Sequence, residues 1–106
     1  MGIRMPLAAH PLIGTWRSLE ETLSVVEYTV SLLSGNFSVT AVDSYDGECG
    51  EVNSVHWNED KMELSFACYW ASSGRYSKCR MQLYSENKVD FTYTYTDHEF
   101  LVRKTV

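Results

Sequence analysis

The sequence predicts an all-β domain, an antiparallel up-and-down meander of about eight strands that closes or nearly closes into a barrel. Apolar and polar residues alternate in short runs, as in strands that bury one face. Turn sequences containing Gly, Asn and Ser separate these runs at the spacing typical of sandwiches and barrels. The connections are too short for the crossover helices of a parallel sheet. Closure is favoured because an open meander leaves two exposed edges, and a two-sheet sandwich is the alternative.

The alternation also places the domain and its strands along the chain. Residues 1–11 are expected to form a flexible N-terminal arm, and residues 12–106 a single β-barrel domain. Residues 18–24 could hold a short helical turn, because Ser18 and Glu21 have the spacing of a capping box. The predicted strands cover residues 13–19, 26–32, 37–41, 52–57, 62–70, 79–83, 89–95 and 100–104.

One hairpin leaves the direction of its side chains open. Asp46-Gly47 is a strong turn pair, and a strict two-residue loop there would point Val55 and Trp57 outward. One extra, bulged residue near positions 48–50 would instead turn both side chains inward. We favour the bulge, because it places Val55 and Trp57 in the core.

Cys68 and Cys79 are placed symmetrically about the turn at Ser73-Gly74, so a two-residue loop would set them opposite each other. Directly opposed cysteines can come within disulfide distance. At a hydrogen-bonded pair, however, the side chains lie further apart. We therefore expect two reduced thiols packed as small apolar groups, with a disulfide or redox switch as the alternative.

Charge and composition argue against nucleic-acid and membrane partners. The net charge is −5 and the nine basic residues are scattered, whereas phosphate-backbone binding needs clustered Lys and Arg. No stretch approaches the ~20 apolar residues that cross a bilayer, and the first residues do not resemble a signal peptide. Three cysteines are an awkward number for a secreted disulfide scaffold. We expect a cytoplasmic protein.

The most distinctive local pattern is Gly14-Thr15-Trp16 on the first predicted strand together with Arg103-Lys104 on the last. It resembles the calycin group, which comprises the lipocalins, the intracellular fatty-acid-binding proteins and the avidins. The resemblance implies that Gly14 and Trp16 lie at the closed end of a lipocalin-like barrel, with Arg103, or else Lys104, across the indole. A guanidinium over Trp contributes roughly 0.5–2 kcal/mol. The chain is shorter than a typical member and has no counterpart of the helical lid.

The presumed inner face is rich in aromatic side chains. An eight-stranded barrel is just wide enough to be filled by side chains or to hold one small ligand. One interpretation is a solid aromatic core, and the other is a small aromatic pocket in which Tyr28 and Tyr93 supply polar groups. The candidate ligand-binding residues are Tyr28, Trp57, Phe66, Trp70 and Tyr93.

The sequence carries no recognisable catalytic, phosphate-binding or dinucleotide-binding motif, so an enzyme is unsupported. The carboxylates at positions 43–48 lack the pattern of a calcium loop, and the histidines lack metal-ligand spacing. We predict no metal and no cofactor. Two functions remain: a barrel that binds a small hydrophobic or aromatic ligand, and a protein–protein interaction module or homodimer with a filled core.

Overall fold

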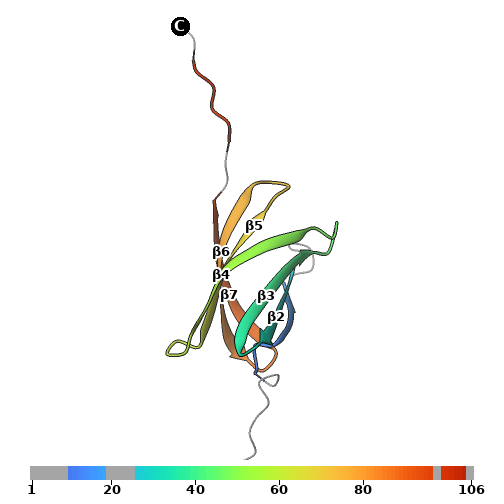
Figure 1. Cartoon of the computed structure of the whole chain (residues 1–106), viewed down its shortest axis with the longest axis vertical. Helices are drawn as coiled ribbons and strands as arrows, with labels where there is room; N and C mark the ends of the chain where they lie inside the picture. Colours follow the sequence, from blue (N-terminus) through green and yellow to red (C-terminus); the bar gives the residue numbers. More distant parts are fainter. Residues whose placement is uncertain (1–9, 19–25, 97–98, 105–106) are drawn as a thin grey trace, which may run out of the picture.

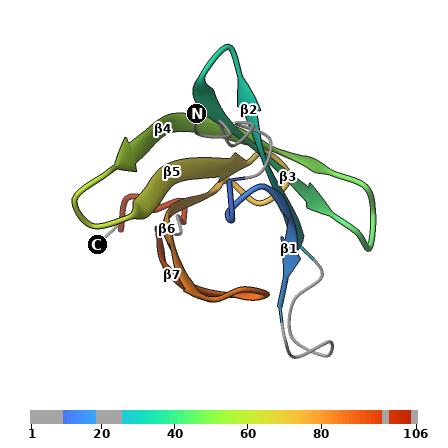
Figure 2. The same ribbon diagram turned by 90° about the horizontal axis from the view of Figure 1, so that it is seen from below.

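The computed structural model describes residues 10–18, 26–96 and 99–104. In this part of the chain, seven antiparallel strands form one sheet in sequence order, and the sheet curls into a half-barrel (Figures 1 and 2). The predicted all-β class and meander topology are confirmed. The strands are β1 (Gly14–Arg17), β2 (Val26–Leu33), β3 (Asn36–Asp43), β4 (Cys49–Asn58), β5 (Glu63–Trp70), β6 (Arg75–Ser85) and β7 (Lys88–Thr96).

The eighth strand expected over residues 100–104 is not formed. Residues 99–104, called the C-terminal tail below, have no regular secondary structure and lead away from the end of β7 (Figure 1). Among the described residues β1 pairs only with β2 and β7 only with β6, so the sheet is not closed into a barrel. Phe100, Leu101 and Val102 are consecutive apolar residues rather than alternating ones, so they define no single face to bury.

The N-terminal arm and the helical turn were predicted in regions that are described only in part. Residues 1–9 and 19–25 lie outside the described residues. His10 and Pro11, which were assigned to the arm, belong to a tight turn in which the Ile13 amide donates to the His10 carbonyl at 3.0 Å. The described residues contain no helix that could span a membrane.

The β2–β3 hairpin follows the local sequence. Ser34 and Gly35 both have positive φ, 53° and 81°, and Leu33 pairs with Asn36 across them. Two consecutive left-handed residues make the hairpin turn whose twist matches that of the flanking strands. Glycine takes this conformation without strain, which is why Ser34-Gly35 marks the turn correctly.

Strand β4 links the two halves of the sheet and contains a bulge where it pairs with β5. It pairs with β3 only at Cys49 and Gly50, and then with β5 from residue 51 onward. The register shifts between Asn53 and His56, where Ser54 has a φ of 57°. Val55 and Trp57 therefore pack against the core, as expected. The irregularity that directs them inward lies in the pairing of β4 with β5, whereas the predicted bulge near residues 48–50 of the β3–β4 hairpin is not formed.

The β5–β6 hairpin places the two buried cysteines differently from the prediction. The loop contains four residues, with Trp70 paired to Arg75. Cys68 consequently pairs with Ser77, and Cys79 with Phe66, so the two cysteines are not directly opposed. Both are free thiols in the structure, as the favoured interpretation held.

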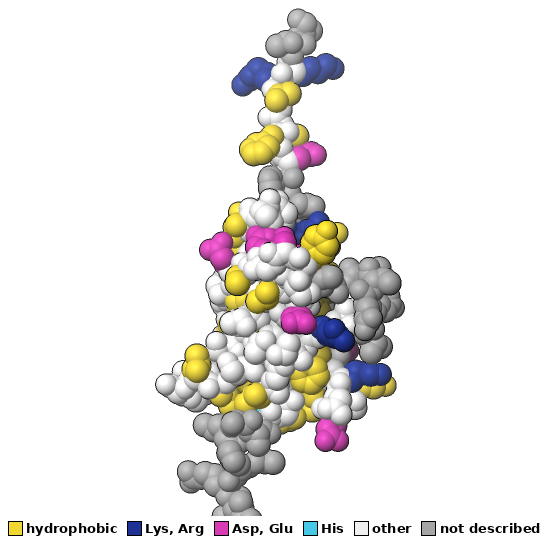
Figure 3. Space-filling view, turned by 90° about the vertical axis from the view of Figure 1, so that its right-hand side faces the viewer, with side chains coloured by type: hydrophobic (Ala, Val, Ile, Leu, Met, Phe, Trp, Pro, Cys, Tyr) yellow, Lys and Arg dark blue, Asp and Glu magenta, His cyan; other side chains and the backbone are white. Residues whose placement is uncertain are grey.

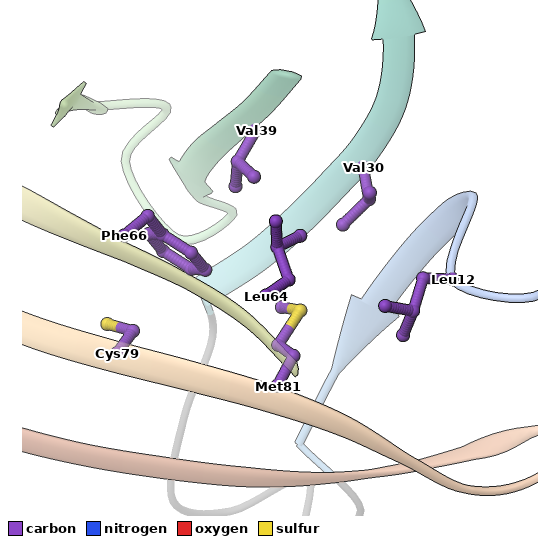
Figure 4. Packing of buried hydrophobic residues seen from close by; sticks show 7 residues of the cluster. All are labelled: Leu12, Val30, Val39, Leu64, Phe66, Cys79 and Met81. Carbon is purple, nitrogen blue, oxygen red and sulfur yellow. The ribbon is translucent and has the colours of Figure 1, made fainter. Parts of the chain in front are cut away.

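The core lies inside the curl of the sheet. Leu64 and Met81 are fully buried at its centre, and Leu12 inserts from the turn that precedes β1 (Figure 4). Trp16 on β1 packs against this cluster. The buried members are Leu12, Val30, Val39, Leu64, Phe66, Cys79 and Met81.

Candidate functional site

Four aromatic rings from three strands meet inside the half-barrel, and we call them the interior aromatic cluster. The ring of Tyr28 on β2 lies 5.8 Å from that of Phe66 on β5 and 4.9 Å from that of Phe91 on β7. Phe91 in turn lies 5.7 Å from Tyr93. Because β2 and β7 are not neighbours in the sheet, these rings meet across the interior rather than along one surface.

Strand register explains why these rings share one face. Tyr93 pairs with Cys79, and Cys79 pairs with Phe66 on the next strand. Phe91 pairs with Met81, two residues further along the same face. Since side chains two apart on a strand point the same way, the alternation that buries Phe66 and Met81 also directs Phe91 and Tyr93 inward.

The cluster grades from buried to exposed. Phe66 is 3% exposed, Tyr28 and Phe91 are half-buried, and Tyr93 is 57% exposed. The Tyr28 hydroxyl makes no hydrogen bond within the part of the chain that the structure describes. A molecule that reached these rings would therefore meet aromatic faces and the hydroxyls of Tyr28 and Tyr93, each able to donate or accept.

The Tyr28 phenol and the two buried thiols beside it keep their protons at pH 7. Burial raises the pKa of the Tyr28 phenol well above its ordinary value, and the adjacent Cys79, Cys68 and Tyr93 raise it further. Burial, with a smaller contribution from Cys68, raises the pKa of the Cys79 thiol to about 12. Burial, followed by Glu48, raises the pKa of Cys68 to about 11. The thiolate is the nucleophilic form of cysteine, so neither buried thiol is suited to nucleophilic catalysis.

The structure brings together three of the five residues predicted to bind a ligand. Tyr28, Phe66 and Tyr93 belong to the interior aromatic cluster. Trp70 is half-buried beside Gly50, where a Cβ would overlap the Cys68 sulfur and approach the Trp70 ring to 3.2 Å. This contact requires glycine at position 50 and fills the space next to Trp70.

Trp57, the fifth predicted residue, belongs to a second group of rings. Its ring lies 5.0 Å from that of Phe37 and 5.3 Å from that of His10, and its indole nitrogen donates to the Glu59 carboxylate. His10 is itself fixed, because its Nδ1 accepts a hydrogen bond of 3.1 Å from the Leu12 amide. These interactions make Trp57 part of the packing around the N-terminal turn.

Of the three residues expected to close the barrel, Gly14 and Trp16 lie together on β1, whereas Arg103 lies apart on the C-terminal tail. Trp16 packs on the core, and its indole nitrogen donates to the Leu12 carbonyl at 2.9 Å. Gly14 has a φ of 145°, a conformation that favours glycine. Arg103 is exposed on the C-terminal tail, which leads away from the strands (Figure 1). In this structure, the Leu12 carbonyl is the polar partner of the indole.

A surface cleft marks the open side of the sheet. It has a volume of about 380 Å³ and lies between β1 and the turn that joins β6 to β7. Its lining residues are Pro11, Ile13, Gly14, Thr15, Trp16, Arg17, Glu86 and Asn87. The cleft therefore runs along the whole of β1.

Sequence analysis missed Phe91 and Leu12. Phe91 was not among the predicted site residues, although its place two residues before Tyr93 on the same predicted strand was the available signal. Leu12 was assigned to the edge of the domain, yet it is only 1% exposed. No period-two pattern identifies Leu12, because it belongs to a turn rather than a strand.

No group of three or more His, Cys, Asp or Glu side chains within the described ranges could hold a metal ion. No family model, curated protein or solved structure matches this chain.

Proposed function

We propose that the protein binds a small, uncharged aromatic or apolar molecule at the interior aromatic cluster. The observation that carries this proposal is the gradient from buried Phe66, through half-buried Tyr28 and Phe91, to exposed Tyr93. Ligand pockets are usually concave and apolar, with few polar groups that fix orientation. The hydroxyls of Tyr28 and Tyr93 are the polar groups of this site, and Tyr28 is the less exposed of the two residues.

The chemistry of the cluster selects for a neutral ligand. The phenol of Tyr28 and the thiols of Cys68 and Cys79 are all protonated at pH 7, because burial raises each pKa. A charged ligand would lose its hydration without gaining a counter-ion from these groups. A flat, neutral ring would instead stack on, or pack edge-on against, Phe91 and Tyr93.

The calycin resemblance and a cytoplasmic location belong to the same proposal. A calycin-like protein would carry its ligand inside the curl of the sheet, and Trp16 packed on the core is compatible with that arrangement. Three free cysteines, two of them buried next to the proposed site, suit a reducing compartment.

Aromatic NMR spectra of the protein during titration with indole, phenol and toluene test the proposal. We expect saturable shifts at the rings of Tyr28, Phe66, Phe91 and Tyr93. The Tyr28→Phe variant removes the hydroxyl and keeps the ring, so it should weaken phenol binding more than toluene binding. Tyr84→Phe, at a 73%-exposed position on β6, is the matched control. Chemical-shift changes confined to exposed rings, or no changes up to the solubility limit of each ligand, would contradict the proposal.

The alternative function, an interaction module or homodimer, is favoured by a different observation. The sheet has open edges at β1 and β7 among the described residues, and an apolar segment lies exposed beyond β7.

A further inference from the structure

The C-terminal tail is an exposed apolar segment of the chain. Phe100 is 92% exposed, Leu101 83% and Val102 90%. Figure 3 shows the tail projecting beyond the strands, with hydrophobic side chains along it. Scattered exposed apolar residues are ordinary, but three in a row in an extended segment are typical of an interaction site.

The same chain carries an edge that could accept such a segment. Strand β1 hydrogen-bonds only to β2 among the described residues, and the cleft of about 380 Å³ runs along its other side. Unpaired strand edges bind added strands through their backbone groups, while side chains supply specificity. The four residues of β1 span roughly 13 Å, and the six residues of the tail span roughly 20 Å, so the tail can pair along the whole edge.

We propose that the tail of one copy pairs with the β1 edge of a second copy, and that the exchange is reciprocal. Each copy then donates residues 99–104 and accepts the same segment from its partner, which gives a closed two-fold dimer. The occupant of the cleft is thus a second copy of this chain. Pairing buries Leu101 and Val102 and removes the open edge at β1.

The length of β7 favours pairing of the tail with β1 of a second copy over pairing with β1 of its own chain. The cleft reaches Glu86 and Asn87, at the beginning of β7, whereas the tail follows the end of β7. Strand β7 has nine residues and spans roughly 30 Å, so a tail of roughly 20 Å that folded back along it would stop short of the cleft. The tail of another copy has no such constraint.

Charge also favours a second copy of this chain as the partner that accepts the tail. The tail contains Arg103 and Lys104 but one carboxylate, Glu99, whereas the whole chain has a net charge of −5. Glu86 and Arg17 both line the cleft, so the acidic surface is that of the chain as a whole rather than of the cleft. Basic residues that approach an acidic surface gain a favourable interaction that salt weakens.

Sedimentation velocity of the full chain over a range of concentrations tests dimer formation under reducing conditions. We expect a monomer–dimer equilibrium that shifts toward monomer as salt rises. Leu101→Asp and Val102→Asp place a charge in the paired tail, and each should weaken the dimer by about tenfold or more. Leu33→Asp is the matched control, because Leu33 is an exposed leucine, 64% exposed, in another part of the molecule. A chain that stays monomeric at all concentrations would overturn the proposal.

Disulfide trapping between different chains distinguishes exchange from closure within one chain. In a Cys49→Ser background, Thr15→Cys and Val102→Cys are introduced into separate proteins, which are then mixed and oxidised. We expect a cross-linked heterodimer. The chain carrying both substitutions should cross-link to dimers at protein concentrations where the dimer forms. An internal cross-link in that chain at the monomer mass, with none between separate chains, would show that the tail pairs with its own β1. A dimer that persists unchanged in Leu101→Asp and Val102→Asp would also overturn the proposal.

Discussion

The two ends of the described chain carry similar apolar residues, but these residues are buried at one end and exposed at the other. Leu12, in the turn before β1, is 1% exposed, whereas Leu101, in the tail after β7, is 83% exposed. Both flank an edge strand of the same sheet. The amount of apolar surface in the sequence is therefore not what decides which end is buried.

The difference lies in the hydrogen bonds that hold the N-terminal end. The Leu12 amide donates to His10 Nδ1, and the Leu12 carbonyl accepts from the Trp16 indole. The Ile13 amide also donates to the His10 carbonyl, which closes the turn. Burying a backbone segment is unfavourable unless its polar groups are paired, and the turn of residues 10–13 pairs them locally. The tail forms no strand ladder in which its backbone groups could pair the same way.

The largest expected effect separates the two leucines. Leu12→Ala should lower the free energy of unfolding by about 2–5 kcal/mol, because it leaves a cavity in a close-packed core. Leu101→Ala should change it by less than about 0.5 kcal/mol, because the residue is exposed. Urea denaturation at low protein concentration measures both. Equal effects would show that the two ends do not differ as the structure indicates.

Alkaline pH tests the interior that Leu12 closes. The pKa of Cys79 is raised from 9.0 to about 12, and that of Cys68 from 9.0 to about 11. The unfolded state thus loses these protons first, so stability is fully present below pH 9 and falls as the pH rises toward 11–12. Each thiol contributes a slope of about 1.4 kcal/mol per pH unit in that window.

Urea denaturation between pH 8 and pH 11 measures this slope. Cys79→Ala should flatten it, because the variant lacks one of the two buried thiols, whereas Cys49→Ser, at an exposed position, should leave it unchanged. An equal slope in all three proteins would show that the buried thiols do not control alkaline stability.

The close approach of Gly50 on β4 to Cys68 on β5 gives a further prediction. Gly50→Ala should lower the free energy of unfolding by about 1–3 kcal/mol, because its Cβ would overlap the Cys68 sulfur. Adding Cys68→Ala removes that sulfur and should recover part of the loss. A double-mutant cycle measures the coupling, and strictly additive effects would contradict the contact.

Side-chain alternation predicted most of the fold but not its irregularities. The period of two identified strands such as β2 and β5, because alternate residues point toward the core, although Ala67 on the other face of β5 is buried as well. The bulge in β4 was not predicted where it lies, because the left-handed conformation of Ser54 has no sequence signature comparable to that of Gly35. The last strand was predicted over residues 100–104, although Phe100, Leu101 and Val102 are consecutive apolar residues that do not alternate.

The candidate site shows the same limit. Alternation correctly predicted that Tyr28, Phe66 and Tyr93 point toward the interior, where they form the interior aromatic cluster. Alternation could not distinguish these three residues from Trp57 and Trp70, which also face inward but lie at other positions along their strands. Those positions depend on loop lengths and on the bulge in β4, which alternation alone does not determine.

The smallest expected effect isolates the hydrogen bond that fixes the N-terminal end. Trp16→Phe keeps an aromatic ring against the core but removes the indole N–H that donates to the Leu12 carbonyl. Because Trp16 is half-buried, water can partly replace that donor, and the free energy of unfolding should fall by about 1 kcal/mol. Hydrogen exchange gives the sharper measurement. The amides of Leu12 and Ile13 should exchange faster in the variant, while those of β5 and β6 should change only with global stability. If exchange at the turn of residues 10–13 follows global unfolding in both proteins, the indole contact does not distinguish this end from the tail.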